Sequence, residues 1–331
     1  MRRSLIPIAI AAALTAIPLA SAAQRVGPVE TVVAFDAAAG ELPEGVAVDR
    51  AGNRYVTLAP LGQIVRIDKH GERSLFAQLP VGESGGLLTG IRFDRSGNLW
   101  AALASFETAT HGVWRITPGG KAERIAALSP TTLPNAFAFG AWGRTYVSDS
   151  FGGAVWALDP GQAPRIWAQD RLLEGTDPEF MIGANGLEVR RGSLYVANTQ
   201  KNLVARIAIG KDGEAGDIAT YARDEQLAGA DGILFDRRGR LYVAANARDA
   251  LVVISPKGHR VRTVVDEGLA FPASLAFGRG KDRRSLLITN FDFADRDEPA
   301  LVKVRVGRSR AKAHAHMRAH CRLHSSYTKP A

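Results

Sequence analysis

The chain has 331 residues, of which 46% are hydrophobic and 23% charged, a composition typical of one large or two medium globular domains. A single cysteine, Cys321, excludes an intramolecular disulfide and therefore a disulfide-stapled scaffold. The net charge of +9 does not indicate a nucleic-acid-binding body, because its excess lies at the two ends of the sequence. Without Arg2, Arg3 and six Lys or Arg of residues 307–331, 34 basic residues face 33 acidic ones.

The first 22 residues are predicted to be a secretory signal peptide. Arg2 and Arg3 precede an apolar run over residues 5–19, and Ala20-Ser21-Ala22 offers a small-residue cleavage site. A membrane anchor is the alternative, but prolines interrupt the run, which is shorter than the roughly 20 residues of a membrane span. We therefore expect a secreted or periplasmic protein that does not stay in the membrane after cleavage.

Six segments of the sequence share one pattern. They begin at Glu44, Thr89, Asn135, Asn185, Asp231 and Ala273, with steps of 45, 46, 50, 46 and 42 residues. Each holds an apolar segment, a tight turn and a second apolar segment, as in "DGILFDRRGRLYVAA" from Asp231, which predicts a β-hairpin. Two more short strands follow, such as "GQIVRID" and "RSLFAQL". Four strands at this period indicate the blade of a β-propeller.

We predict an all-β, six-bladed propeller of four-stranded antiparallel blades over residues 23–306. The last copy has only three strands of its own, which end at 301–306, whereas the strand 30–35 precedes the first copy without a partner. Pairing these two segments would complete the last blade and remove the open edge. A solenoid is the alternative architecture, but the additional N-terminal strand favours a closed ring.

Residues 307–331 form a basic tail that contains four histidines and Cys321. A Cys/His tract can bind metal. The segment has no apolar periodicity to order such ligands, so we expect it to be disordered.

The residue before the innermost strand of each blade is expected at the mouth of the central channel. Five of the six residues at this position are polar: Glu44, Thr89, Asn135, Asn185 and Asp231, with Ala273 as the sixth. Turn chemistry alone is one explanation, because turns favour Asn and Asp. The position is equivalent in all copies, however, so the side chains converge on one axis, where clustered carboxylates favour a bound cation.

Four of these residues are predicted to supply oxygen ligands to a divalent metal ion: Glu44, Asn135, Asn185 and Asp231. The absence of His and Cys from the ring suits Ca²⁺ better than a tetrahedral zinc site, with Mg²⁺, Mn²⁺ or adventitious Zn²⁺ as alternatives. His70 and His259 are expected in hairpin turns. His111 is the one histidine with a position from which it could reach the mouth.

Three longer loops, 105–112, 171–183 and 290–300, are expected at the same mouth. They carry apolar side chains that could wall a pocket: Phe106, Phe180, Met181, Phe291 and Phe293. We predict that Phe180 and Met181, together with Asn135, contact the substrate. Four residues near the ends of second strands form either an outer shell of the site or hydrogen bonds within turns: Asp149, Asn198, Asn246 and Asn290.

Four motifs at blade starts resemble those of the senescence marker protein (regucalcin)/gluconolactonase family over residues 29–306: "PEGVAVD", "PNAFAF", "GANGLEV" and "ADGILFD". The resemblance implies a calcium-dependent lactonase-like propeller with the cation on Glu44, Asn185 and Asp231, while Asn135 contacts the substrate or a metal-bound water. It implies hydrolysis of a cyclic ester, with Asp231 either as general base on a water or purely as a ligand while metal-bound hydroxide attacks. The substrate-contacting arginine of the family is absent from "LPNAFAF", so the resemblance does not extend to sugar-lactone specificity.

Two other functional classes stay open. A non-catalytic propeller similar to NHL-repeat domains would bind a peptide or glycan without a metal. A streptogramin lyase-like enzyme would need a catalytic histidine at the mouth, for which His111 is the candidate. The convergent oxygen ligands favour a metal-dependent lactonase that acts on a small lactone or ester, with no nucleic-acid partner.

Overall fold

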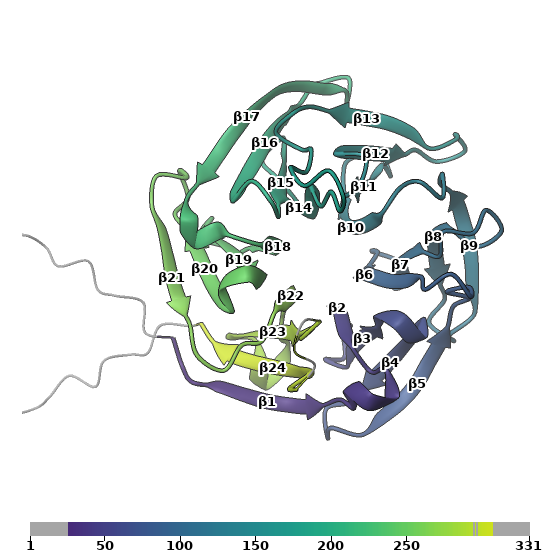
Figure 1. Ribbon diagram of the computed structural model, residues 1–331, viewed down its shortest axis with the longest axis vertical. Helices are drawn as coiled ribbons and strands as arrows, with labels where there is room; N and C mark the ends of the chain where they lie inside the picture. Colours follow the sequence, from purple (N-terminus) through teal and green to yellow (C-terminus); the bar gives the residue numbers. More distant parts are fainter. Residues whose placement is uncertain (1–25, 294, 296, 307–331) are drawn as a thin grey trace, which may run out of the picture.

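The predicted architecture is confirmed. The computed structural model describes residues 26–293, 295 and 297–306, so the predicted signal peptide (1–22) and basic tail (307–331) lie outside the described residues. The described chain forms six four-stranded antiparallel sheets arranged as blades around a central axis (Figure 1). No helix in this part of the chain is long and apolar enough to cross a membrane.

The strands fall into four concentric sets, and each set takes one strand from every blade, in order from blade 1 to blade 6. The innermost strands are β2 (Pro43–Val48), β6 (Leu87–Phe93), β10 (Pro134–Phe139), β14 (Ala184–Arg190), β18 (Ala230–Phe235) and β22 (Pro272–Phe277). The second strands are β3 (Arg54–Leu58), β7 (Leu99–Ala104), β11 (Thr145–Asp149), β15 (Ser193–Asn198), β19 (Leu241–Ala245) and β23 (Ser285–Asn290).

The two outer sets complete each blade. The third strands are β4 (Gln63–Ile67), β8 (Gly112–Ile116), β12 (Ala154–Leu158), β16 (Leu203–Ile209), β20 (Ala250–Ile254) and β24 (Ala300–Arg305). The outermost strands are β5 (Arg73–Gln78), β9 (Ala122–Ala127), β13 (Arg165–Gln169), β17 (Ala215–Arg223), β21 (Val261–Val265) and β1 (Val29–Ala34). The helices of the described residues are short 3₁₀ turns: η1 (Ala37–Ala39), η2 (Ala59–Leu61), η3 (Glu225–Leu227), η4 (Asn246–Arg248) and η5 (Gly280–Asp282).

The N-terminal strand closes the ring, as predicted from the sequence. β1 pairs antiparallel with β24, with Val29 opposite Val304 and Ala34 opposite Ala300. The sheet order β1-β24-β23-β22 joins the first strand of the chain to its last three (Figure 1). A solenoid is therefore excluded. Strand β1 covers the edge that β24 would otherwise leave open.

The hydrophobic core consists of six clusters, each of which lies between two neighbouring blades. Val56 of blade 1 and Leu287 of blade 6, for example, belong to one cluster and are both fully buried. Because strand side chains alternate between the two faces of a sheet, each blade buries one face against each neighbour. Ring closure is therefore required for all six blades to bury both faces.

The innermost strands all carry a β-bulge at the same place. Each register shift spans the predicted channel-mouth residue and the residue after it, as between Pro43 and Val46, or between Ala230 and Ile233. The same irregularity occurs in the other four blades. A bulge frees its residues from the sheet ladder and re-aims their side chains. The repeated bulge thus turns the mouth residues away from the inter-blade core.

Glycine follows the mouth residue in four of the six bulges: Gly45, Gly90, Gly186 and Gly232. A Cβ atom on Gly90 would lie 2.4 Å from the Asn135 carbonyl oxygen of the next blade, and one on Gly186 would lie 2.2 Å from the Asp231 carbonyl oxygen. No side chain fits at such distances. These glycines therefore allow neighbouring innermost strands to approach closely at the mouth.

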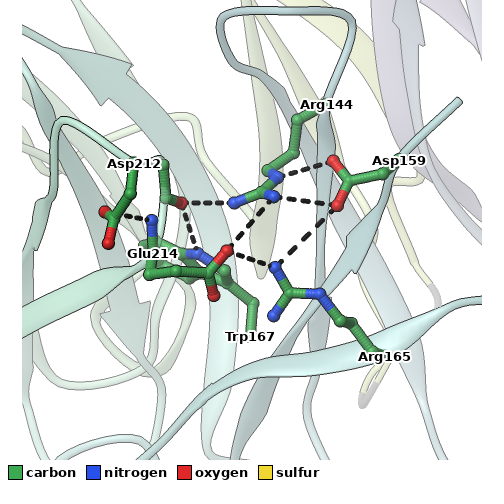
Figure 2. Close-up of polar contacts among 7 residues, drawn as sticks. Arg144, Asp159, Arg165, Trp167, Asp212 and Glu214 are labelled. Atoms are coloured by element: carbon green, nitrogen blue, oxygen red, sulfur yellow. Dashed lines mark hydrogen bonds and ion pairs between the residues drawn. The ribbon is translucent and has the colours of Figure 1, made fainter.

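Polar contacts hold blades 3 and 4 together at the end of the channel opposite the mouth (Figure 2). Arg144, in the β10–β11 turn, donates to both carboxylate oxygens of Asp159 at 2.6 and 2.8 Å. It also donates to the carbonyl of Gly213 in blade 4. Arg165 pairs with Glu214 of blade 4 at 2.6 Å. The Asp159 carboxylate raises the pKa of Arg144 further above its usual range, so this guanidinium stays charged and paired.

The close contact at Gly90 yields a test of ring packing. Replacing Gly90 by Ala forces the backbones of blades 2 and 3 apart, and we expect a loss of about 2–3 kcal/mol in the free energy of unfolding. Gly119→Ala is the matched control, because its added Cβ meets only one atom within 4 Å, at 3.9 Å. Urea unfolding curves of both variants check the prediction; equal midpoints would contradict it.

Candidate metal centre

The mouth residues of all blades lie at one end of the channel. In each blade the start of the innermost strand pairs with the end of the second strand, as Pro43 does with Leu58. The loops that enter the innermost strands and leave the second strands therefore share this mouth. All four predicted metal ligands are buried there, with 8% or less of each residue exposed: Glu44, Asn135, Asn185 and Asp231.

Glu44 and Asp231 form an interacting pair of buried acids, although 187 positions separate them in the sequence. Burial raises the pKa of Glu44 well above its usual range, and the negative charge of Asp231 raises it further. Burial also raises the pKa of Asp231 to about 8, despite hydrogen bonds from Asn246 and Asn185 that lower it. Two ionised carboxylates in this setting are costly, and a bound divalent cation would offset that cost.

Two buried oxygens of the predicted ligands lack a hydrogen-bond partner within the described structure: Glu44 Oε2 and Asn185 Oδ1. An unsatisfied buried acceptor costs about 1–3 kcal/mol. An amide oxygen and an ionised carboxylate oxygen only accept hydrogen bonds, so either a donor or a cation could satisfy them. The donor set of carboxylate and amide oxygens fits a hard divalent cation such as Ca²⁺.

Hydroxyl groups orient the two mouth amides. Asn185 Nδ2 donates to Thr199 Oγ1 at 3.0 Å, and Thr199 Oγ1 donates to the Ala230 carbonyl of the next blade at 3.0 Å. Asn135 Nδ2 likewise donates to Ser150 Oγ at 3.4 Å, and Ser150 Oγ donates to the Ala184 carbonyl of blade 4 at 2.7 Å. Because each amide nitrogen is held by a hydroxyl, the amide oxygen is left for another partner.

Sequence reasoning missed these hydroxyl groups. Thr289 has a similar role, because its Oγ1 donates to the Glu44 carbonyl at 2.5 Å and so links blade 6 to blade 1. The available signal was a Ser or Thr at or just after the end of a second strand, as in "SDS" at 148–150 and "NT" at 198–199. Its meaning depends on contacts between blades, which the repeat pattern does not contain.

The described residues hold no group of three or more His, Cys, Asp or Glu side chains that could bind a metal. The ligand set expected from the sequence has only two carboxylates, Glu44 and Asp231, and its remaining members are amides, so it is not a group of this kind. His70 and His259 lie between third and fourth strands, as predicted. A zinc-type cage of His or Cys is not found in this part of the chain.

His111 is not available at the mouth. The residue is wholly buried, with 0% of its surface exposed. Its Nδ1 accepts a hydrogen bond from the Phe106 backbone N–H at 3.1 Å, and its Nε2 lies 3.0 Å from Thr132 Oγ1. Burial lowers the pKa of His111 to about 4. The ring therefore holds the 105–112 loop in place, and a lyase mechanism based on this histidine is disfavoured.

The four residues considered for an outer shell have different roles. Asn246 Nδ2 donates to Asp231 Oδ2 at 3.3 Å and so contacts the site. Asp149 and Asn198 hold loops by hydrogen bonds to backbone groups. Asn290 donates to a backbone carbonyl at 3.5 Å, and its buried Oδ1 has no partner in the described structure.

Aromatic side chains from the mouth loops gather beside the polar centre. Phe106 and Phe151 stack with ring centroids 6.2 Å apart, and Phe180 meets Phe151 edge-on at 5.8 Å. Large apolar side chains of these loops stay exposed: Phe180 (58%), Met181 (44%) and Phe293 (43%). An exposed apolar cluster next to buried polar groups is typical of a ligand-binding pocket.

Comparison with known proteins agrees with the motif resemblance. Residues 178–292 match the family described as "SMP-30/Gluconolactonase/LRE-like region". These residues include Phe180, Asn185 and Asp231. Among curated protein sequences, none matches the chain significantly.

Solved structures share the fold of this chain. A gluconolactonase of Xanthomonas campestris superposes with a TM-score of 0.66 over 87% of this chain and 93% of its own, at 16% identity. Regucalcin of Agrobacterium tumefaciens, a calcium-binding protein, gives 0.62 over 81% and 92%, at 15% identity. Virginiamycin B lyase of Staphylococcus aureus gives 0.57 over 80% and 82%, at 17% identity. At these identities the likeness shows a shared fold alone.

The neutral, buried state of His111 predicts a loss of stability in mild acid. Its pKa of about 4 in the folded chain lies below the ordinary value of 6.5, so the unfolded chain takes up a proton first as the pH falls through this window. Between pH 7 and pH 5 we expect the free energy of unfolding to fall by about 2 kcal/mol because of His111. His111→Gln cannot titrate. This variant should reduce the pH-dependent change in the free energy of unfolding, measured by urea unfolding, by that amount. An unchanged pH dependence would contradict the prediction.

Proposed function

We propose that this propeller, which carries an SMP-30/gluconolactonase/LRE-like region, is a divalent-metal-dependent hydrolase that opens a lactone at the channel mouth. The observation that carries the proposal is the buried pair Glu44 and Asp231 beside Asn185, with two oxygens that lack partners in the described structure. The shared fold with a gluconolactonase supports the reaction class.

Glu44, Asn185 and Asp231 would hold the cation, with Asn135 as a further oxygen ligand or as a contact to the substrate. Ca²⁺ suits these oxygens best, and Mg²⁺, Mn²⁺ and Zn²⁺ are the other candidates. A divalent cation, when bound, supplies Lewis-acid polarisation of an ester carbonyl. Two carboxylates balance its charge, so the centre is neutral overall.

Asp231 is the candidate general base. A water adds to the ester carbon while its proton passes to the Asp231 carboxylate; the ring C–O bond then breaks and the proton goes to the leaving oxygen, which gives a hydroxy acid. Asn246 donates to Asp231 Oδ2 and would hold the carboxylate in position. Asp231 as a ligand alone is the competing role.

The apolar wall bears on the kind of lactone. Phe180 and Met181 are exposed beside the mouth, and Phe151 connects Phe180 to Phe106. We propose that these side chains bind an apolar substituent of the substrate. A lactone with an aryl or alkyl chain then buries apolar surface that a sugar lactone does not have.

The proposal is tested by measuring calcium-dependent thermal stability and lactone hydrolysis, with and without chelator. The free energy of unfolding of the wild type should rise by about 2.7 kcal/mol at a calcium concentration 100 times the dissociation constant. Glu44→Gln should lose this gain, and Asp231→Asn should lower kcat/KM at least about 100-fold, as expected for loss of a general base.

Glu188→Gln is the matched control, because Glu188 is a buried acid of an innermost strand that pairs with Arg92 at 2.9 Å instead of facing the mouth. This variant should keep the calcium response. Full activity and an intact calcium response in both mouth variants would overturn the proposal. A wild type without metal response or lactone hydrolysis would favour a binding propeller.

Phe180→Ala tests the apolar wall. We expect KM for an alkyl- or aryl-substituted lactone to rise about five- to tenfold with kcat little changed, since lost apolar burial weakens binding in ground and transition states alike. KM for an unsubstituted lactone should change little. Leu75→Ala is the control, because Leu75 is equally exposed (60%) but lies on the outermost strand β5. If Phe180→Ala changed KM equally for both lactones, Phe180 would not bind the apolar substituent.

A further inference from the structure

A second hollow opens at the opposite end of the channel from the metal centre. Its volume is about 1210 Å³. Its lining extends from Gly90, Gly186 and Gly232, next to the mouth residues, to the turns between innermost and second strands. Within the described structure, none of the mouth residues themselves lines it. The hollow therefore ends beside the mouth residues and does not include them.

Arginine dominates the charge of this hollow, which we call the far cavity. Eight arginines and two acids line it. Both acids are already neutralised, because Glu188 pairs with Arg92 at 2.9 Å and Asp236 pairs with Arg240 at 2.6 Å. The other six arginines are exposed and form no ion pair with any described residue: Arg50, Arg237, Arg238, Arg279, Arg283 and Arg284.

These six guanidinium groups come from turns of blades 5, 6 and 1, which are consecutive in the closed ring, so they lie along one half of the hollow. Two of them donate to backbone carbonyls: Arg50 to Arg95 at 2.6 Å and Arg283 to Gly280 at 3.3 Å. Like charges held around one recess repel each other and focus a positive potential into it. An anion in the recess would relieve that repulsion.

Blades 3 and 4 show that arginine at this end of the ring is not unpaired by default. There Arg144 is held by Asp159, and Arg165 by Glu214 (Figure 2). Each of these two structural arginines has a carboxylate partner. The six arginines of the far cavity have no such partner in the described chain, which indicates a ligand that is not part of the fold.

The positive charge continues beyond the far cavity. A smaller hollow of about 240 Å³ shares Arg238 with it and adds Arg190, Arg191 and Arg206. Val306, the last described residue, lines the far cavity, and the sequence after it carries six Lys or Arg and no acid. Arginines are therefore concentrated at this end of the described propeller, and further basic residues follow Val306 in the sequence.

We propose that the far cavity binds a soluble ligand with several phosphate groups. Arginine forms bidentate hydrogen bonds with phosphate oxygens. Six excess positive charges around one recess call for several negative charges within a small volume, and phosphate groups supply these more compactly than carboxylates do. The recess favours a compact molecule over a flat membrane surface, which would meet only its rim. This binding is independent of the proposed hydrolase function.

Inositol hexakisphosphate and tripolyphosphate serve as probes, with binding measured by calorimetry on the protein with its tail at about 0.15 M ionic strength. We expect both to bind wild type, and the double variant Arg237→Gln/Arg284→Gln to bind at least tenfold more weakly. Its thermal midpoint without ligand should stay that of wild type or rise slightly, since both side chains are exposed and repel their neighbours.

Arg223→Gln/Arg262→Gln is the matched control, because it removes the same charge from the outermost strands β17 and β21. It should bind the probes as wild type does. Equal affinity of both double variants would overturn the proposal, because net charge or the basic tail would then account for binding. Citrate binding as tightly as the phosphate probes, or phosphatidylglycerol vesicles binding where the soluble probes do not, would also contradict it.

Discussion

Each blade of this protein can bury its two apolar faces only against its two neighbours, and the other features of the structure depend on this constraint. The clusters between blades contain nearly all of the large buried side chains. A chain with six such units must therefore close, and the pairing of β1 with β24 is the closure. Closure aims the innermost strands at a common axis, so residues as distant as Glu44 and Asp231 come to interact.

The arrangement of polar groups at the mouth lowers the stability of the fold when no ligand is bound. The repeated bulge removes its residues from the sheet ladder, and burial then makes ionised carboxylates costly. Thr199 and Ser150 bind the amide nitrogens of Asn185 and Asn135 and leave the amide oxygens for a different partner. Such an arrangement is unfavourable without a ligand and is stabilised by one. The same interactions therefore support both the proposed metal site and its position on the axis.

The two ends of the channel have opposite chemistry. Buried carboxylates lie at one end, and arginines without carboxylate partners in the described chain line the far cavity at the other. The ion pair between Arg92 and Glu188 lies among the innermost strands that line the far cavity. A cation and an anion would thus each be attracted to a different end of one channel, with no competition between them.

The amino-acid sequence by itself determined the strands, the closed ring and the convergence of Glu44, Asn185 and Asp231, because a repeat places equivalent residues at equivalent positions around an axis. Only the tertiary structure decided which groups those residues meet. Whether His111 reaches the mouth or is buried, and whether Arg144 or Arg237 finds a carboxylate, depends on side-chain contacts of about 3 Å within and between blades. Such contacts join residues at varied separations, 15 positions for Arg144 and Asp159 and 21 for His111 and Thr132. The repeat pattern specifies the blade of each residue but not the direction of its side chain.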